Sequence, residues 1–173
     1  MTRTASKTVA PQNHVRFSSP SRLTENSRSR LIATLNERLA DGIDLYTQIK
    51  VAHWNVKGPH FAALHPLFDG FATTIAGYND QIAERAVILG GLALGTARHV
   101  ARSSRLAEYP GDLALDLEHV RTLIARFDGF ADGLRASRTI AEEEGDVDTS
   151  DMLTAMLQET EKNAWFLRAT AEG

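Results

Sequence analysis

Residues 61–89 have the sequence FAALHPLFDGFATTIAGYNDQIAERAVIL. Apolar residues recur in this stretch at steps of three and four, which is the period of a helix with one buried face. They are Phe61, Leu64, Phe68, Phe71, Ile75, Tyr78, Ile82, Ala86 and Leu89. The stripe ends at a pair of glycines, Gly90 and Gly91, which is a helix stop signal. A long amphipathic helix is therefore predicted here.

Three more stripes of the same period flank this one. The first extends from Thr24, a residue type that caps helix N-termini, to the Gly-Pro pair at 58–59. Another covers about residues 113–134 and fades into the acidic turn 142–148. The last is expected to begin at a cap formed by Thr149 or Ser150. The chain thus contains four predicted long helices.

The connections between these helices differ in length. The first two and the last two helices are joined by short turns, whereas residues 92–111 form a long connection with a short helix near 96–103. An up-down bundle with one long crossover has ferritin-like connectivity, and no strand pattern competes with it. We therefore predict an all-α, ferritin-like four-helix bundle over residues 24–173, preceded by a flexible basic arm over residues 1–23.

Composition and charge narrow the function classes. The chain has no cysteine, which excludes disulfide scaffolds, iron–sulfur clusters and cysteine nucleophiles, so a metal would bind His, Asp or Glu. No apolar run reaches the roughly 18 residues that cross a bilayer, and no signal-peptide stretch opens the chain, so a cytoplasmic protein without membrane contact is expected. Residues 1–30 contain six Lys or Arg and one Glu, whereas the remainder contains 13 Lys or Arg and 21 Asp or Glu. A basic arm on an acidic body is typical of polyanion binding.

Four potential metal ligands lie on one face of the second helix. His65 and Asp69 are four residues apart, as are Asp80 and Glu84, so each pair presents neighbouring side chains. At about 1.5 Å per residue the two pairs are centred roughly 22 Å apart, too far for one ion. If two copies pack with these helices antiparallel, each His65/Asp69 pair meets the other copy's Asp80/Glu84 pair. A ligand set of imidazole and carboxylate without thiolate suits iron or manganese. The alternative interpretation of this helix face is a solvated polar stripe that binds no metal.

Residues 50–96 resemble a known family. The segments KVAHWNVKGPHFAALHPLFDGF and YNDQIAERAVILGGLALGT are similar to the mini-ferritins called Dps, DNA-binding proteins from starved cells. The resemblance implies a hollow homo-dodecamer built on two-fold dimers, with ferroxidase centres at the two-fold interfaces. It implies His53, His65 and Asp69 of one chain, together with Asp80 and Glu84 of its partner, as ligands. From spacing alone, a core histidine is the alternative for His53.

The resemblance also implies an activity. Fe(II) is the substrate, hydrogen peroxide the oxidant, and ferric mineral is stored inside the shell, which protects DNA from oxidative damage. Trp54 matches the family's aromatic neighbour of the iron, with a packed residue near a helix end as the alternative. No organic cofactor is expected. The chain has no Glu-x-x-His motif, which argues independently against a ferritin centre within one subunit.

Two rival functions remain open at this point. One is a structural, DNA-compacting nucleoid protein whose metal site is weak or non-catalytic. The other is a metal-bridged oligomer without turnover.

Two further sets of charged residues are candidates for function. Asp146 and Asp151 lie in and just after the acidic turn, and the resemblance places this segment at three-fold channels through which iron enters. A symmetric ring of carboxylates attracts cations; a solvated helix connection is the alternative. The basic arm could contact DNA without a sequence motif, because non-specific affinity for phosphates depends on counterion release. The alternative function of the arm is a solubilising terminus. The candidate DNA-binding residues, which would place the protein at the nucleoid, are Arg3, Lys7, Arg16 and Arg22.

Overall fold

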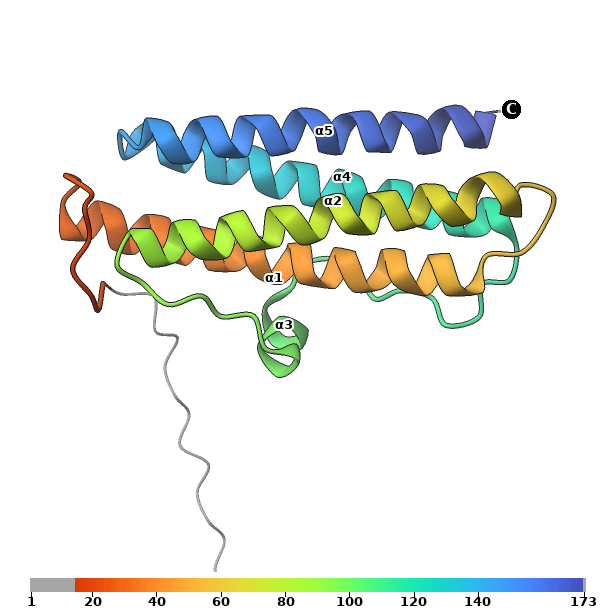
Figure 1. The fold of residues 1–173 in the computed structure, drawn as a ribbon, viewed down its shortest axis with the longest axis horizontal. Coiled ribbons are helices and arrows are strands. Elements are labelled where there is room, and N and C mark those ends of the chain that lie inside the picture. The colour runs from red at the N-terminus through yellow and green to blue at the C-terminus, as the bar shows by residue number, and fades with distance from the viewer. Residues whose placement is uncertain (1–14, 173) are drawn as a thin grey trace, which may run out of the picture.

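The computed structural model describes residues 15–172, which form five helices and, within that range, no strand. The helices are α1 (Glu25–Asn55), α2 (Phe61–Ile88), α3 (Ala97–Ser103), α4 (Asp116–Glu143) and α5 (Val147–Glu172). The four long helices run side by side along the long axis, and the short α3 protrudes from them (Figure 1). The predicted all-α bundle with one long crossover and a short helix is confirmed.

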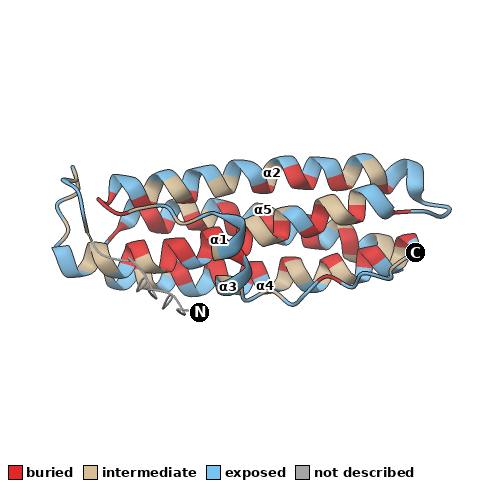
Figure 2. Ribbon diagram, turned by 90° about the horizontal axis from the view of Figure 1, so that it is seen from below, coloured by how far each residue is buried: buried red, intermediate tan, exposed pale blue. Residues whose placement is uncertain are grey.

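The apolar stripes of the four long helices meet along the middle of the bundle. Figure 2 shows buried positions repeating along the inward side of each helix and exposed positions on the outside. Phe68 of α2 and Phe127 and Phe130 of α4 are completely buried, and the rings of Phe71 and Phe127 pack edge to face at 5.4 Å. Burial of this apolar surface is the main force that holds the helices together.

Local chemistry sets the helix ends. The side chain of Thr24 accepts a hydrogen bond from the Ser27 amide and so caps α1 as predicted. The α1–α2 turn contains Gly58 at φ +135°, where a Cβ would lie 2.6 Å from the Asp116 carboxylate. That carboxylate in turn accepts the backbone N–H of His60 at 2.8 Å. The turn that precedes α2 is therefore fastened to the start of α4.

The expected start of the last helix at Thr149 or Ser150 is wrong, because α5 already begins at Val147. Asp146 supplies the cap: its carboxylate accepts the Thr149 amide at 3.3 Å and the Thr149 hydroxyl. The same carboxylate accepts Arg85 Nη2 of α2 at 2.6 Å. This contact with α2 favours Asp146 over the other capping residues nearby.

Polar contacts fix the crossover between α2 and α4. Ser104 donates to Asp44, and Arg105 pairs with the buried Asp41 at 3.0 Å. Further along, the hydroxyl of Tyr109 and Nδ1 of His119 are 2.6 Å apart.

Within the described range, none of the helices is long and apolar enough to cross a membrane.

Candidate metal centre

His53 of α1 and His65 of α2 form the fixed part of the candidate centre. Nδ1 of His53 lies 2.8 Å from the carbonyl oxygen of His65, and Nδ1 of His65 lies 3.0 Å from the carbonyl oxygen of His53. Because a carbonyl oxygen can only accept, each Nδ1 carries the proton and donates it. In the neutral imidazole this hydrogen bond selects the tautomer whose Nε2 is unprotonated, the form in which imidazole binds a metal.

The two imidazoles hold each other in place. Their rings stack with centroids 3.8 Å apart, and the ring of Phe61 lies 5.1 Å from that of His65. The reciprocal hydrogen bonds also join the C-terminal end of α1 to the N-terminal part of α2. The His53 position is thus explained by a bond to His65 rather than by a place in the apolar core.

Asp69 lies one helical turn beyond His65 and is paired with Lys50 of α1. Nζ of Lys50 donates to Asp69 Oδ1 at 2.7 Å. The hydrogen bond and charge of Lys50 hold the pKa of Asp69 below its ordinary value, and His53 and His65 add to this effect. A cation that binds Asp69 Oδ1 therefore competes with Lys50.

Lys50 was not among the residues that the sequence indicated for this site. The signal available was its position on the same face of α1 as His53 and Trp54, which follow Lys50 by three and four residues. Trp54 is 67 % exposed, and Nζ of Lys50 lies 6.0 Å from the centre of its ring. Trp54 is therefore available to a neighbouring molecule rather than packed within this chain.

Asp80 and Glu84 occupy the other end of α2, and both are exposed. Over residues 15–172 neither carboxylate takes part in an ion pair or a side-chain hydrogen bond. Because α2 is continuous from Phe61 to Ile88, these carboxylates are centred roughly 22 Å along the axis from His65 and Asp69. The described part of the chain accordingly brings no three His, Asp or Glu residues together for one metal ion.

The surface of α2 between the two pairs is open. Nothing lies within 4 Å of a Cβ built on Gly70 or Gly77, and Ala76 is exposed. Near Glu84, Val87 and Ile88 expose about half of their surfaces, 50 % and 46 %. This combination of small and apolar residues permits another helix to approach closely, as the proposed antiparallel dimer needs.

The acidic turn holds its carboxylates in different ways. Asp146 is only 4 % exposed and its charge is neutralised by Arg85, so it is bound within the subunit. Asp151 is exposed on α5, and the side chain of Asp148 is 86 % exposed. Of the two predicted channel residues, Asp151 is the one whose carboxylate is free to meet solvent.

The basic arm is described only from residue 15. Arg3 and Lys7 lie outside the described residues, whereas Arg16 and Arg22 are exposed. The amides of Arg16 and Phe17 donate to the Gly90 carbonyl at 2.8 and 3.1 Å, and Ser19 Oγ donates to the Ile88 carbonyl at 2.7 Å. Residues 15–19 are thus attached to the C-terminal end of α2.

Comparisons with known proteins identify the family of this chain. A family model described as a ferritin-like domain matches residues 32–172. The DNA protection during starvation protein of Agrobacterium fabrum is 42 % identical over 147 residues, which cover 85 % of this chain and 91 % of the relative. That of Brevibacillus brevis is 32 % identical and covers 86 % and 99 %.

Solved structures show the same likeness. DpsC from Streptomyces coelicolor superposes with a TM-score of 0.87 at 29 % identity, covering 95 % of both chains. The chain is therefore a ferritin-like protein. Within that class it belongs to the Dps family, the DNA protection during starvation proteins.

Proposed function

We propose that this chain assembles as two-fold dimers into a hollow dodecamer that oxidises Fe(II) and stores the ferric product. The observation that carries the proposal is the His53–His65 pair, whose reciprocal hydrogen bonds leave two Nε2 atoms free for a metal. Membership of the Dps family supports it. The centre would be completed by Asp69 of the same chain and by Asp80 and Glu84 of a partner.

Each residue has a defined task in this reaction. The two imidazoles and Asp69 would bind Fe(II) from one side, and Asp80 and Glu84 from the other. Two Fe(II) ions together supply the two electrons that reduce one hydrogen peroxide and two protons to two waters, so no hydroxyl radical is released. Trp54, exposed beside His53, would lie against the same interface.

The acidic turn would admit iron to the shell. Asp151 is exposed and, repeated around a three-fold axis, would form a ring of carboxylates that attracts cations. Asp146 would act differently, since its pairing with Arg85 and Thr149 holds the turn in shape. In this proposal Asp146 positions the channel and Asp151 lines it.

The name of the relatives, DNA protection during starvation protein, extends the proposal to DNA. Removal of Fe(II) and peroxide would protect DNA chemically. Arginine and lysine in the arm, including the exposed Arg16 and Arg22, would add non-specific contact with phosphates and place the shell at the nucleoid. Twelve arms on one shell would act together through effective concentration.

Ferrous oxidation and DNA binding should be measured on one preparation of assembled shells. The variant His65→Ala should lose at least about tenfold in peroxide-dependent Fe(II) oxidation, because a ligand that holds the other histidine is removed. His99→Ala is the matched control, since His99 lies on α3 and its ring has Ser103 as its hydrogen-bond partner within residues 15–172. Oxidation by the His65→Ala shell at the control rate would refute His65 as a ligand of the centre, whereas no oxidation by the unaltered shell would refute the ferroxidase proposal and favour the DNA-compacting alternative.

A further inference from the structure

The segment from Arg85 to Ala107 differs in charge from the rest of the body. It contains four arginines and no Asp or Glu, whereas residues 31–173 as a whole are acidic. Two of these arginines are used inside the subunit: Arg85 pairs with Asp146 and Arg105 with Asp41. The other two, Arg98 and Arg102, are exposed and have no ion-pair partner between residues 15 and 172.

Arg98 and Arg102 both belong to α3, and we call them the α3 patch. They are four residues apart, so their like charges are neighbours on one side of the helix, which disfavours helix formation. The helix is also short, and Thr96 gives it no side-chain cap bond. Local stability therefore does not explain two arginines here.

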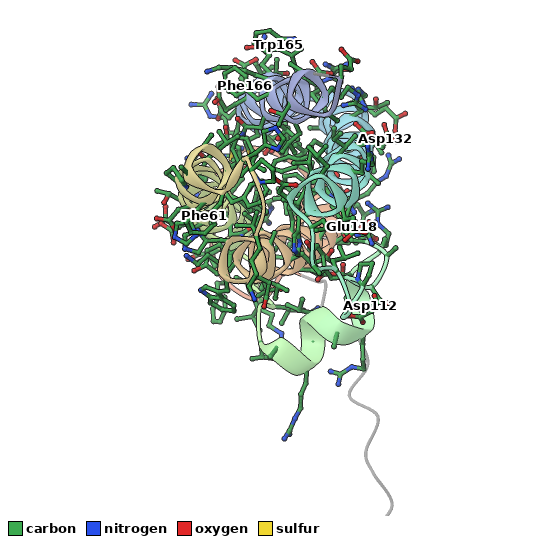
Figure 3. The ribbon with its side chains drawn as sticks, turned by 90° about the vertical axis from the view of Figure 1, so that its right-hand side faces the viewer. Phe61, Asp112, Glu118, Asp132, Trp165 and Phe166 are labelled. Carbon is green, nitrogen blue, oxygen red and sulfur yellow. The ribbon has the colours of Figure 1, made fainter. Side chains whose placement is uncertain are left out.

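The α3 patch lies on a helix that projects from the side of the bundle (Figure 1). Among the helices, α3 packs chiefly on α1, with Val100 as its buried residue. Figure 3 shows α3 projecting from the bundle on the side opposite Trp165 and Phe166 of α5. The attachment point of the arm is close in sequence, because residues 16 and 17 bind Gly90, seven residues before α3 begins.

We propose that the α3 patch binds the phosphate backbone of duplex DNA, independently of the arm. The two arginines are separated by about 6 Å along the helix axis, close to two phosphate steps of one strand at about 3.4 Å each. Guanidinium groups are well suited to phosphate, and nothing in the patch reads bases, so binding is independent of sequence. This inference rests on the DNA-protecting function proposed above and adds a second contact surface to it.

The experiment compares assembled shells of the full chain with three variants. They are Arg98→Gln/Arg102→Gln, an arm variant that combines deletion of residues 2–14 with Arg16→Gln and Arg22→Gln, and the two sets of changes together. The probe is a duplex of arbitrary sequence of about 30 base pairs, titrated by fluorescence anisotropy between about 50 and about 200 mM salt. Lys57→Gln/Arg121→Gln is the matched control, since it also removes two exposed charges that are unpaired in the described part of the chain.

The α3 patch should contribute to the salt dependence of binding. Each lost phosphate contact reduces the steepness of the plot of log binding constant against log salt concentration by about 0.9. The slope of the double α3 variant should therefore be shallower by about two for each chain that contacts the DNA. The arm variant should keep residual binding that the combined variant lacks, and Arg98→Lys/Arg102→Lys in place of the glutamines should restore it. The control variant should bind like the full chain.

Three results would overturn the inference. Equal DNA affinity for the α3 variant and the control would remove the patch from the DNA surface. Failure of the α3 variant to form shells while the lysine variant assembles would assign the patch to a contact between subunits. Absence of DNA binding by the full chain would end both DNA proposals, while unchanged Fe(II) oxidation would leave the ferroxidase proposal standing.

Discussion

Mixing two inactive variants tests whether each oxidation centre is built from two chains. His65 and Glu84 are 19 residues apart on the continuous helix α2, roughly 28 Å along its axis, so one chain cannot bring them to the same ion. In an antiparallel dimer of one His65→Ala chain and one Glu84→Ala chain, one centre loses both residues and the other keeps both. Random association of equal amounts makes about half of the dimers mixed, so about a quarter of all centres are intact.

The assay is peroxide-dependent Fe(II) oxidation by shells that have been dissociated, mixed and reassembled. Native mass spectrometry verifies that both variants occur in one shell. Each variant alone should be inactive, and the mixture should recover about a quarter of the wild-type rate.

The control is a mixture of His65→Ala with Asp69→Ala chains. Both changes fall in the same half of the centre, so every mixed dimer still lacks an intact site. A His65→Ala/Glu84→Ala mixture that stays as inactive as this control, in shells of verified mixed composition, would refute the shared centre.

Three other changes test single contacts. Lys50→Met removes the ion pair of Asp69, so anaerobic titration should show an Fe(II) affinity higher by roughly 1.5- to 5-fold, which corresponds to the free energy of an exposed ion pair. Unchanged Fe(II) affinity would contradict a competing role for Lys50. Asp148→Asn/Asp151→Asn should slow iron uptake at low ionic strength while assembly persists, as followed by stopped-flow absorbance, and equal kinetics would exclude these residues from the route. Burial lowers the pKa of His119 below 6.5, so the unfolded chain takes up the proton first as pH falls. Thermal stability should therefore fall more between about pH 7 and about pH 5 in the wild type than in His119→Asn, and equal losses would contradict this reasoning.

The helices were predictable because their signals are local. Apolar residues spaced three and four positions apart predicted all four long helices, and Thr24 predicted the start of α1. The start of α5 was missed, because the segment from Asp146 to Ser150 offers several capping residues in a row. The choice among them depends on Arg85, which is 61 residues away in sequence and adjacent only in the folded chain.

The residues of the candidate centre, which stay a prediction, came from the sequence, whereas the contacts between them did not. Spacing along one helix paired His65 with Asp69, and the family resemblance added His53. The reciprocal bonds between His53 and His65 depend on the register of α1 against α2, which no spacing within a single helix reveals. The Lys50–Asp69 pair was not predicted for the same reason, since its members belong to different helices.

The division of ligands along α2 has a consequence for control of the chemistry. One chain carries both halves of the proposed centre, but the stiffness of a helix keeps them roughly 22 Å apart. Under the proposed function, two Fe(II) ions can be held and oxidised together only where two chains meet. Each two-fold contact then completes a pair of centres, so paired oxidation requires at least the dimer from which the shell is built. Free subunits would bind Fe(II) weakly through one half of the site and would not perform the paired oxidation.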